Sequence, residues 1–293
     1  MTPLRQRMIE DMQIRNLSPH TQDSYVQQIS QFARYFGKSP AELLPEDIRT
    51  YQVYLTNEKR LASSSILIAV SAIRFLFKVT LKREWDLGEV VPTCKKPQKL
   101  PTILSPEEVV QFLDCVPGIK HRMILTTCYA AGLRISEAVR LKPHAIDSKR
   151  MVIRVEQGKG QKDRYVMLSP KLLETLRTYW RAARPKQVLF AGRIPGRPIN
   201  RSAVELACQK ARQLSGIRKP IGPHSMRHAF AVHLLESGTD VRTIQLLLGH
   251  RSLATTARYL RIATSKVCSA SSPLDLLPRP VCTDPKPAPP QYF

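Results

Sequence analysis

The sequence has few of the features that mark secreted, metal-binding or membrane proteins. Its six cysteines are scattered and none forms a CxxC pair, so neither a disulfide framework nor a zinc site is expected. No stretch reaches the roughly 18–20 uncharged apolar residues of a membrane-spanning helix, and the charged N-terminus does not match a secretory signal peptide. We therefore expect a cytoplasmic protein with reduced thiols and no membrane partner.

Acidic residues are also scarce, because 23 Asp and Glu stand against 46 Lys and Arg, giving a formal net charge of +23. No carboxylate cluster stands out that could hold two metal ions, which disfavours a metal-dependent nuclease or transposase. The positive charge predicts a polyanionic partner, either nucleic acid or an anionic membrane surface. Because the basic residues run through sequence with helical patterns rather than a tail, we favour nucleic acid.

Residues 1–88 have the pattern of a compact helical domain. Apolar residues recur at helical spacing between Ser18 and Gly37, and further helical segments begin at Pro45 and near Ser63. Aromatic residues follow these segments, and we interpret them as core rather than as a surface for stacking bases. They are Tyr25, Phe32, Tyr51, Phe75 and Phe77.

A segment rich in proline and lysine, residues 89–103, is typical of an interdomain linker. A second domain is expected over 104–265, with helical sequence from a capped start at Ser105 through Leu141 and then a β-hairpin with Lys159 at its turn. Further helices are expected at 170–184, 201–215, 224–237, 240–248 and 252–262. The predicted fold class is thus mainly α with a small β-hairpin. Residues 266–293 hold seven prolines and are expected to be extended or disordered.

Four short motifs carry side chains that suit a single reaction. They are AAGLRISEA with Arg134 and Glu137, GKG with Lys159, HSMRH with His224 and Arg227, and LLGHRSLATTARYL with His250 and Tyr259. Taken singly, each has an ordinary alternative, namely a surface charge, a turn or a packed side chain. Their joint occurrence in one strongly basic chain favours a shared site.

These residue types match what cleavage of a phosphodiester without a metal requires. Arg134 and Arg227 would bind the nonbridging oxygens, because the planar guanidinium group binds phosphate bidentately and stays charged. Tyr259 would be the nucleophile. His224 would accept its proton, and His250 would donate a hydrogen bond to the phosphate.

Two further residues complete this hypothesis. Lys159 would protonate the departing 5′-oxygen, and Glu137, one helical turn from Arg134, would orient that arginine by charge pairing. No metal ion or nucleotide cofactor is expected, because fixed cations would stabilise the transition state.

Six of these positions, together with the GLRxSE and LGHxSxxTTxxY strings, resemble the catalytic set of the tyrosine recombinase (phage integrase) family, which includes the Xer and integron integrases. They are Arg134, Lys159, His224, Arg227, His250 and Tyr259. The resemblance covers nearly the whole chain. It implies a helical, SAM-like core-binding domain at 1–88 and an α+β catalytic domain at 104–265.

The same resemblance implies site-specific cleavage and rejoining of double-stranded DNA through a 3′-phosphotyrosine intermediate. It implies a homotetramer on two DNA sites, in the cytoplasm at the nucleoid. Integration, excision or transposition of a mobile element would be the outcome.

Two other functions remain as alternatives. A type IB topoisomerase would use the same tyrosine chemistry, but the compact chain lacks large insertions. A non-catalytic DNA-binding regulator is disfavoured by the intact set of reactive residues. The sequence departs from the family at 266–293, where no short C-terminal helix is evident. The tail is either a free extension or docks on a neighbouring subunit through Leu274, Leu276 and Leu277, and we favour docking.

Overall fold

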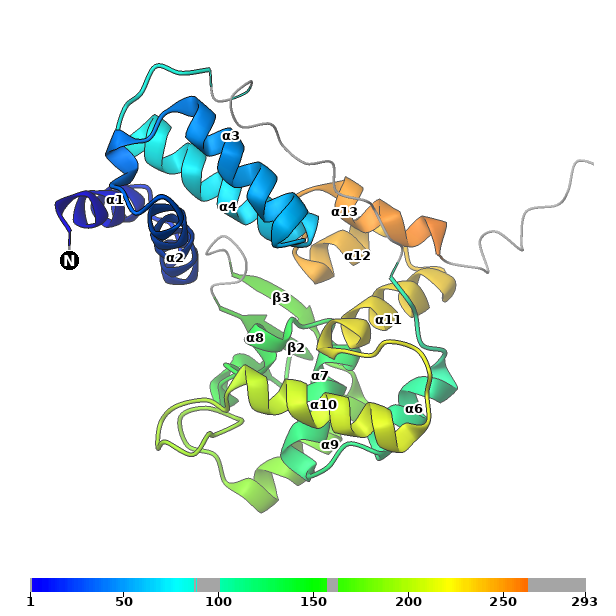
Figure 1. The fold of residues 1–293 in the computed structure, drawn as a ribbon. Coiled ribbons are helices and arrows are strands. Elements are labelled where there is room, and N and C mark those ends of the chain that lie inside the picture. Colours follow the sequence, from blue (N-terminus) through cyan, green and yellow to red (C-terminus); the bar gives the residue numbers. More distant parts are fainter. Residues whose placement is uncertain (1, 87, 89–100, 157–162, 263–293) are drawn as a thin grey trace, which may run out of the picture. The chain divides into compact units, whose positions relative to one another are not determined.

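The computed structural model describes residues 2–86, 88, 101–156 and 163–262 (Figure 1). The chain divides into two compact units, residues 1–99 and 100–293. This division falls inside the segment that was expected to be a linker. Lys159 and the tail 266–293 lie outside the described residues.

The N-terminal unit is built from helices, as predicted. They are α1 (Pro3–Ile14), α2 (Pro19–Phe36), η1 (Pro40–Glu42), α3 (Pro45–Val53) and α4 (Ser63–Phe75), and π-helical turns extend α3 as η2 (Tyr54–Glu58) and α4 as η3 (Leu76–Thr80). The ends of α2 follow the sequence signals. The Ser18 side chain accepts a hydrogen bond from the amide of Thr21, and Gly37 ends the helix in the left-handed region at φ 66°.

Aromatic side chains form the centre of this unit. Phe32, Tyr51 and Phe77 are buried, and the Phe32 ring lies 5.0 Å from that of Tyr51. Tyr25 and Phe75 are partly buried against this core, with their ring centroids 6.0 Å apart. The interpretation of these aromatic residues as core is confirmed.

One helical stretch comes nearer to a membrane-spanning helix than the sequence suggested. Ser63–Thr80, formed by α4 and η3, is long and apolar enough by length and composition alone, with a mean hydropathy of 1.5. It contains Arg74 and Lys78, and its buried side chains belong to the core of the helical unit. Packing against α2 therefore accounts for its apolar character.

The second unit contains eight α-helices among the residues that the structure describes. They are α6 (Pro106–Asp114), α7 (Ile119–Ala130), α8 (Ile135–Ala138), α9 (Pro170–Ala183), α10 (Arg201–Ser215), α11 (Pro223–Glu236), α12 (Val241–Leu248) and α13 (Leu253–Ala257), with 3₁₀ turns η4 (Pro143–Ala145) and η5 (Arg258–Arg261). The helices predicted after residue 170 are confirmed.

The segment predicted as helical, from Ser105 through Leu141, is divided into the three helices α6, α7 and α8. Ser105 does cap α6, accepting a hydrogen bond from the Glu108 amide. The helical run is then broken twice, at Gly118 and at Gly132, where the backbone has φ of 75° and 62°. Glycine reaches this left-handed region readily, so both breaks have a local cause. The second break places Arg134 at the start of a new helix, α8.

A three-stranded antiparallel sheet lies in this unit in the order β1-β2-β3. It consists of β1 (Ile146–Asp147), β2 (Val152–Val155) and β3 (Arg164–Met167). Ile153 pairs with Val166 in the β2–β3 register. The predicted hairpin strands are confirmed, while the short edge strand β1 was not expected.

Helix α7 lies at the centre of the second unit and packs against α11 and α9 (Figure 1). Helix α12 contacts both α11 and β3, and α11 contacts the η5 turn. These contacts bring together segments that are far apart in the sequence, namely α8, β3, α11 and the chain from α12 to η5. Three of the four predicted motifs lie on these segments, and the fourth, with Lys159, lies outside the described residues.

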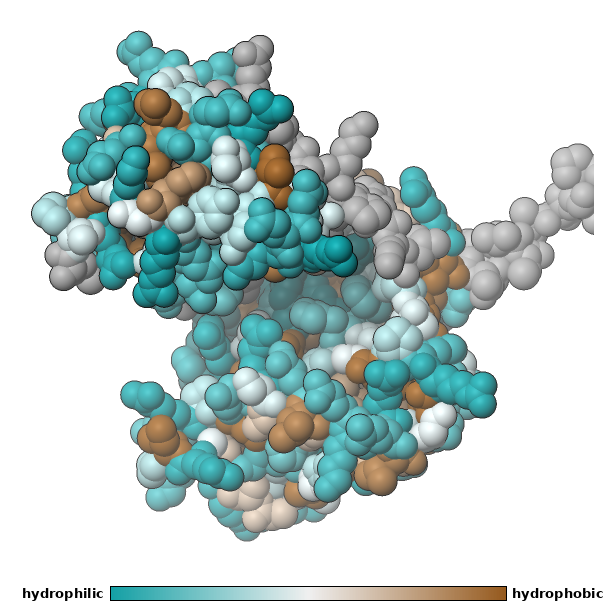
Figure 2. Space-filling model, in the orientation of Figure 1, coloured by the Kyte–Doolittle hydropathy of each residue, from teal (hydrophilic) through white to brown (hydrophobic). Residues whose placement is uncertain are grey.

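The surface visible in Figure 2 is mostly hydrophilic, with hydrophobic side chains scattered in small groups. Such scattered exposure is normal for globular proteins. The two cores bury the larger apolar side chains, including Phe112 and Phe190 in the second unit.

Candidate active site

Arg134 lies at the N-cap of α8, directly after the turn at Gly132. Its backbone amide donates a hydrogen bond to Oε2 of Glu137 at 2.8 Å, and its Nη1 donates to Oε1 at 2.7 Å. A Cβ atom at position 132 would lie 2.5 Å from the ring of Phe230, so only glycine fits this turn. The pairing of Glu137 with Arg134 that the spacing predicts is present.

Arg227 extends from α11 into the same cluster and is only 4% exposed. Its two terminal nitrogens donate hydrogen bonds of 2.5 Å to the carbonyl oxygens of Gly132 and Leu248. Burial, and then the positive charge of Arg134, lower the pKa of Arg227 to about 9. The guanidinium group therefore stays charged at neutral pH. It is held between α11, the turn at Gly132 and the end of α12.

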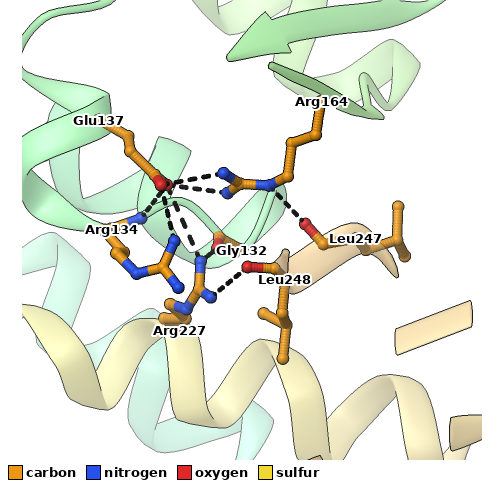
Figure 3. Close-up of polar contacts among 7 residues, drawn as sticks. All are labelled: Gly132, Arg134, Glu137, Arg164, Arg227, Leu247 and Leu248. Carbon is orange, nitrogen blue, oxygen red and sulfur yellow. Dashed lines mark hydrogen bonds and ion pairs between the residues drawn. The ribbon is translucent and has the colours of Figure 1, made fainter. Parts of the chain in front are cut away.

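Glu137 joins the arginines, as Figure 3 shows. Arg164 binds both of its carboxylate oxygens, at 2.9 and 2.8 Å, and Arg227 lies 3.9 Å from Oε2. Burial alone would raise the pKa of Glu137, but the hydrogen bonds and charges of Arg164 and Arg134 hold it at about 2. One carboxylate is thus shared by three guanidinium groups, which leaves positive charge in excess.

Arg164 had no predicted role, although the sequence contains a signal for one. Alternate residues of a strand face the same side, so Arg164 shares its side with Val166 and Leu168. Both of these are buried, whereas Tyr165 and Met167 are exposed. A charged residue on the inward side of an amphipathic strand requires a buried partner of opposite charge. That partner is Glu137.

His250 follows Gly249, which ends α12 in the left-handed region at φ 61°. The Nδ1 atom of His250 is 2.9 Å from the hydroxyl oxygen of Thr256. Burial, followed by the charges of Arg227 and Arg134, lowers the pKa of His250 to about 3. The imidazole is therefore neutral at physiological pH, and a donor Thr256 hydroxyl would leave the ring proton on Nε2.

Tyr259, the predicted nucleophile, lies in the η5 turn and is only 1% exposed. Its hydroxyl is 2.8 Å from Nδ1 of His228, and its ring is stacked on that of His250 with centroids 6.5 Å apart. Burial, and then the charge of Arg258, lower the pKa of His228 to about 4. A neutral His228 accepts the hydrogen bond that the tyrosine hydroxyl donates.

His228 belongs to the HSMRH motif but had no predicted role, whereas His224 was the predicted proton acceptor. The structure separates the two along α11. His224 is among the more exposed residues of α11, and its side chain makes no hydrogen bond to the described residues. Partial burial and the charges of Arg227 and Arg201 lower its pKa. Although His224 and Arg227 are three residues apart, only Arg227 points into the buried cluster.

The described residues thus bring Arg134, Glu137 and Arg227 into contact, with His250 and Tyr259 stacked on each other close by. Within those residues, no group of three His, Cys, Asp or Glu side chains is close enough to hold a metal ion. Fixed cations that need no rearrangement stabilise charge that develops on a phosphate.

Comparison with known proteins identifies both parts of the chain. Residues 102–266 match the phage integrase family, and residues 4–87 match the phage integrase N-terminal SAM-like domain. A putative integrase/recombinase of Sinorhizobium fredii, y4qK, is 70% identical over 293 residues, covering 100% of this chain and 95% of that protein. A tyrosine recombinase of Pseudothermotoga lettingae is 32% identical, covering 90% of this chain and 94% of that protein.

Solved structures share the fold. The XerA recombinase is 28% identical with a TM-score of 0.52, covering 92% of this chain and 99% of that chain. A lambda integrase dimer bound to a COC′ core site has a TM-score of 0.72 at 17% identity, covering 92% and 97% of the two chains.

Proposed function

We propose that the cluster around Glu137 is where this chain binds the scissile phosphate. The chain belongs to the phage integrase family and is a tyrosine recombinase that breaks and rejoins DNA. The observation that carries this proposal is a buried carboxylate shared by three arginines. Such a cluster holds positive charge in a fixed geometry, which is what a pentavalent phosphorus transition state requires.

Arg134 and Arg227 would bind the two nonbridging oxygens of this phosphate. Arg134 uses one terminal nitrogen to bind Glu137, and the side chain remains 19% exposed. Arg227 is anchored from behind by the carbonyls of Gly132 and Leu248. Neutral His250, with its proton on Nε2, would donate a hydrogen bond to the phosphate without adding charge.

Tyr259 would attack the phosphorus atom. The bond from its oxygen to phosphorus forms while the bond from phosphorus to the 5′-oxygen breaks, giving a 3′-phosphotyrosine and a free 5′-hydroxyl. With a pKa of about 4, His228 stays neutral, so its Nδ1 can accept a hydrogen bond, but it is too weak a base to hold the tyrosine proton at neutral pH. For His224 to take the tyrosine proton, Tyr259 must first leave His228 and become exposed.

Lys159 would return a proton to the departing 5′-oxygen, which completes the proton balance of the step. A 5′-hydroxyl of the partner strand then attacks the phosphotyrosine and reseals the DNA. One phosphate ester is exchanged for another in each step, so neither ATP nor a metal ion is needed.

Complete strand exchange on two duplexes requires four cleavages, so we propose a homotetramer on two DNA sites. The core-binding role falls to residues 1–88, where the family's SAM-like domain matches, and catalysis falls to residues 104–265. The tail 266–293 would join neighbouring subunits. Truncation after Lys266 is expected to preserve binding to one site and to abolish recombination between two. The working location would be the cytoplasm, at the nucleoid.

Covalent trapping tests the proposed function. The substrates would be duplexes with a randomised central sequence, in which a nick lies close to each possible cleavage position. They would be incubated with the protein in EDTA, without nucleotide. The short nicked fragment diffuses away after cleavage, so the covalent adduct accumulates. We expect an adduct whose tryptic peptide begins at Tyr259, because trypsin cuts after Arg258. An intact duplex is the control. Its cleaved strand stays base-paired and can be rejoined, so little covalent adduct should accumulate.

The outcomes separate the alternatives. An adduct on Tyr165 or Tyr179 would overturn the assignment of the nucleophile, and the absence of any adduct would favour a non-catalytic DNA-binding protein. Loss of the adduct in EDTA would contradict the metal-free mechanism. Relaxation of a supercoiled plasmid that lacks the recovered sequence would favour a topoisomerase.

A further inference from the structure

Arg164 lies on the short strand β3, and its side chain makes three hydrogen bonds in the cluster. Its Nη1 and Nη2 atoms donate to the two oxygens of Glu137 at 2.9 and 2.8 Å, and its Nε donates to the carbonyl oxygen of Leu247 at 3.1 Å. The side chain is only 11% exposed. One guanidinium group therefore ties β3 both to α8 and to the end of α12 (Figure 3).

The hydrogen bonds from Arg164 help to occupy the lone-pair positions of the Glu137 carboxylate. An ionised carboxylate has about four lone-pair positions, and four hydrogen bonds are made here, two from Arg164 and two from Arg134. If Arg164 were absent, Glu137 could accept a full bidentate pair from Arg134 or draw in Arg227, which lies 3.9 Å away. Either change would turn a guanidinium group away from the phosphate.

The contact with Leu247 acts on the segment that carries His250. Arg164 and Arg227 bind the adjacent carbonyls of Leu247 and Leu248, which a helix C-terminus leaves without partners in the helix. A Cβ at Gly249 would lie 2.8 Å from Cδ of Arg164, so the arginine passes directly against the residue before His250.

We infer that Arg164 is a positioning residue for the recombination reaction, which keeps Arg134 and Arg227 available to the phosphate and holds the turn before His250. This inference rests on the proposed function of the cluster. Lysine could not replace it, because an ammonium group lacks the planar fork that binds both carboxylate oxygens while a third nitrogen reaches Leu247.

The test compares two substrates, both duplexes of the sequence recovered by trapping. One carries an ordinary scissile phosphate, and the other a methylphosphonate, in which a methyl group replaces one nonbridging oxygen and removes the negative charge. A residue that acts by placing cations against that charge matters less on the neutral substrate. A residue that only stabilises the fold affects both substrates equally.

Arg164→Met is expected to slow covalent trapping on the phosphate about 100-fold at saturating DNA, and clearly less on the methylphosphonate. Arg134→Ala should show the same pattern. Arg164→Lys, which keeps the charge and is the variant of choice if Arg164→Met fails to fold, should fall between Arg164→Met and the unchanged protein. Arg154→Met is the matched control, because Arg154 lies on the same hairpin in an exposed pair with Asp163, and it should match the unchanged protein.

Two results would overturn the inference. They are an equal loss on both substrates for Arg164→Met and Arg164→Lys, or full activity of Arg164→Lys on the phosphate. If the unchanged protein forms no adduct on either substrate, the proposed function fails instead. The two failures are therefore distinguishable.

Discussion

The cation cluster and the segment that carries Tyr259 are held in very different ways. In the cluster, Arg227 bonds to two carbonyls and Arg164 to three oxygens on two elements. Tyr259 lies on a four-residue 3₁₀ turn after the five-residue helix α13, and within the described residues its hydroxyl has one hydrogen bond, to His228. Among the described residues, several hydrogen bonds thus fix the arginines, whereas few fix the hydroxyl of Tyr259, the proposed nucleophile.

This difference fits the separate tasks that we propose. Groups that stabilise a transition state by charge are most effective when they need not move during the reaction. Tyr259, the proposed nucleophile, is only 1% exposed and would have to move before it could reach a DNA phosphate.

The largest expected effect is that of Tyr259→Phe, which removes the reacting oxygen. Cleavage should be abolished, while DNA binding stays nearly unchanged because cationic residues supply most of the affinity. Covalent adducts on denaturing gels and binding in gel-shift assays measure the two properties. Adduct formation by this variant would show that another residue is the nucleophile. Loss of a single buried hydrogen bond should lower the free energy of unfolding by only about 1 kcal/mol.

Arg134→Ala and Arg227→Ala should both slow cleavage on the order of 100-fold or more, but they should differ in stability. Arg227 is buried, and its loss leaves the carbonyls of Gly132 and Leu248 without a donor, so we expect a loss of about 3–5 kcal/mol in the free energy of unfolding. Arg134 is partly exposed, so Arg134→Ala should lower the free energy of unfolding much less. Chemical denaturation measures both, and equal destabilisation would contradict the ranking of the two anchors.

Lys159→Ala and Arg134→Ala should distinguish proton transfer to the leaving oxygen from charge stabilisation by the arginines. If Lys159 protonates the leaving oxygen, the defect of Lys159→Ala should be rescued by a substrate with sulfur at the 5′-bridging position, because a thiolate leaves without a proton. Arg134→Ala should not be rescued, since its loss leaves the charge on the nonbridging oxygens unneutralised. Rates of covalent trapping on the two substrates provide the measurement. Equal rescue of both variants would mean that the roles are wrongly assigned.

The smallest expected effect concerns stability against pH around Tyr259. The pKa values of His228 and His250 in the folded protein, about 4 and about 3, lie below the ordinary value of 6.5. As pH falls below 6.5, the unfolded chain therefore takes up protons first, and the folded state loses stability down to about pH 4. Each histidine contributes at most about 1.4 kcal/mol per pH unit.

Substitution of His228 provides the measurement for this prediction. His228→Gln should flatten the dependence of the free energy of unfolding on pH between 6.5 and 4. His20→Gln is a suitable control, because that residue is exposed on α2. An unchanged slope in His228→Gln would show that His228 is not held in its neutral form.

Local signals in the sequence were enough to predict most elements of the fold. Capping residues such as Ser18 and Ser105 mark where helices begin, and the alternation in β2 and β3 marks a hairpin. Such signals act within a few residues, so they can be interpreted without knowing the rest of the fold. The break at Gly118 was not predicted.

The sequence by itself determined which reactive residue types are present and in what order, since the spacing of motifs around Arg134, Arg227 and Tyr259 is a property of the chain. Only the tertiary structure decided which of them touch. Arg164 meets Glu137 across 27 residues and Leu247 across 83, and His228 meets Tyr259 across 31. The period of a strand or helix tells which side a residue faces, but the partner there, and the burial that shifts its pKa, depend on how distant segments pack.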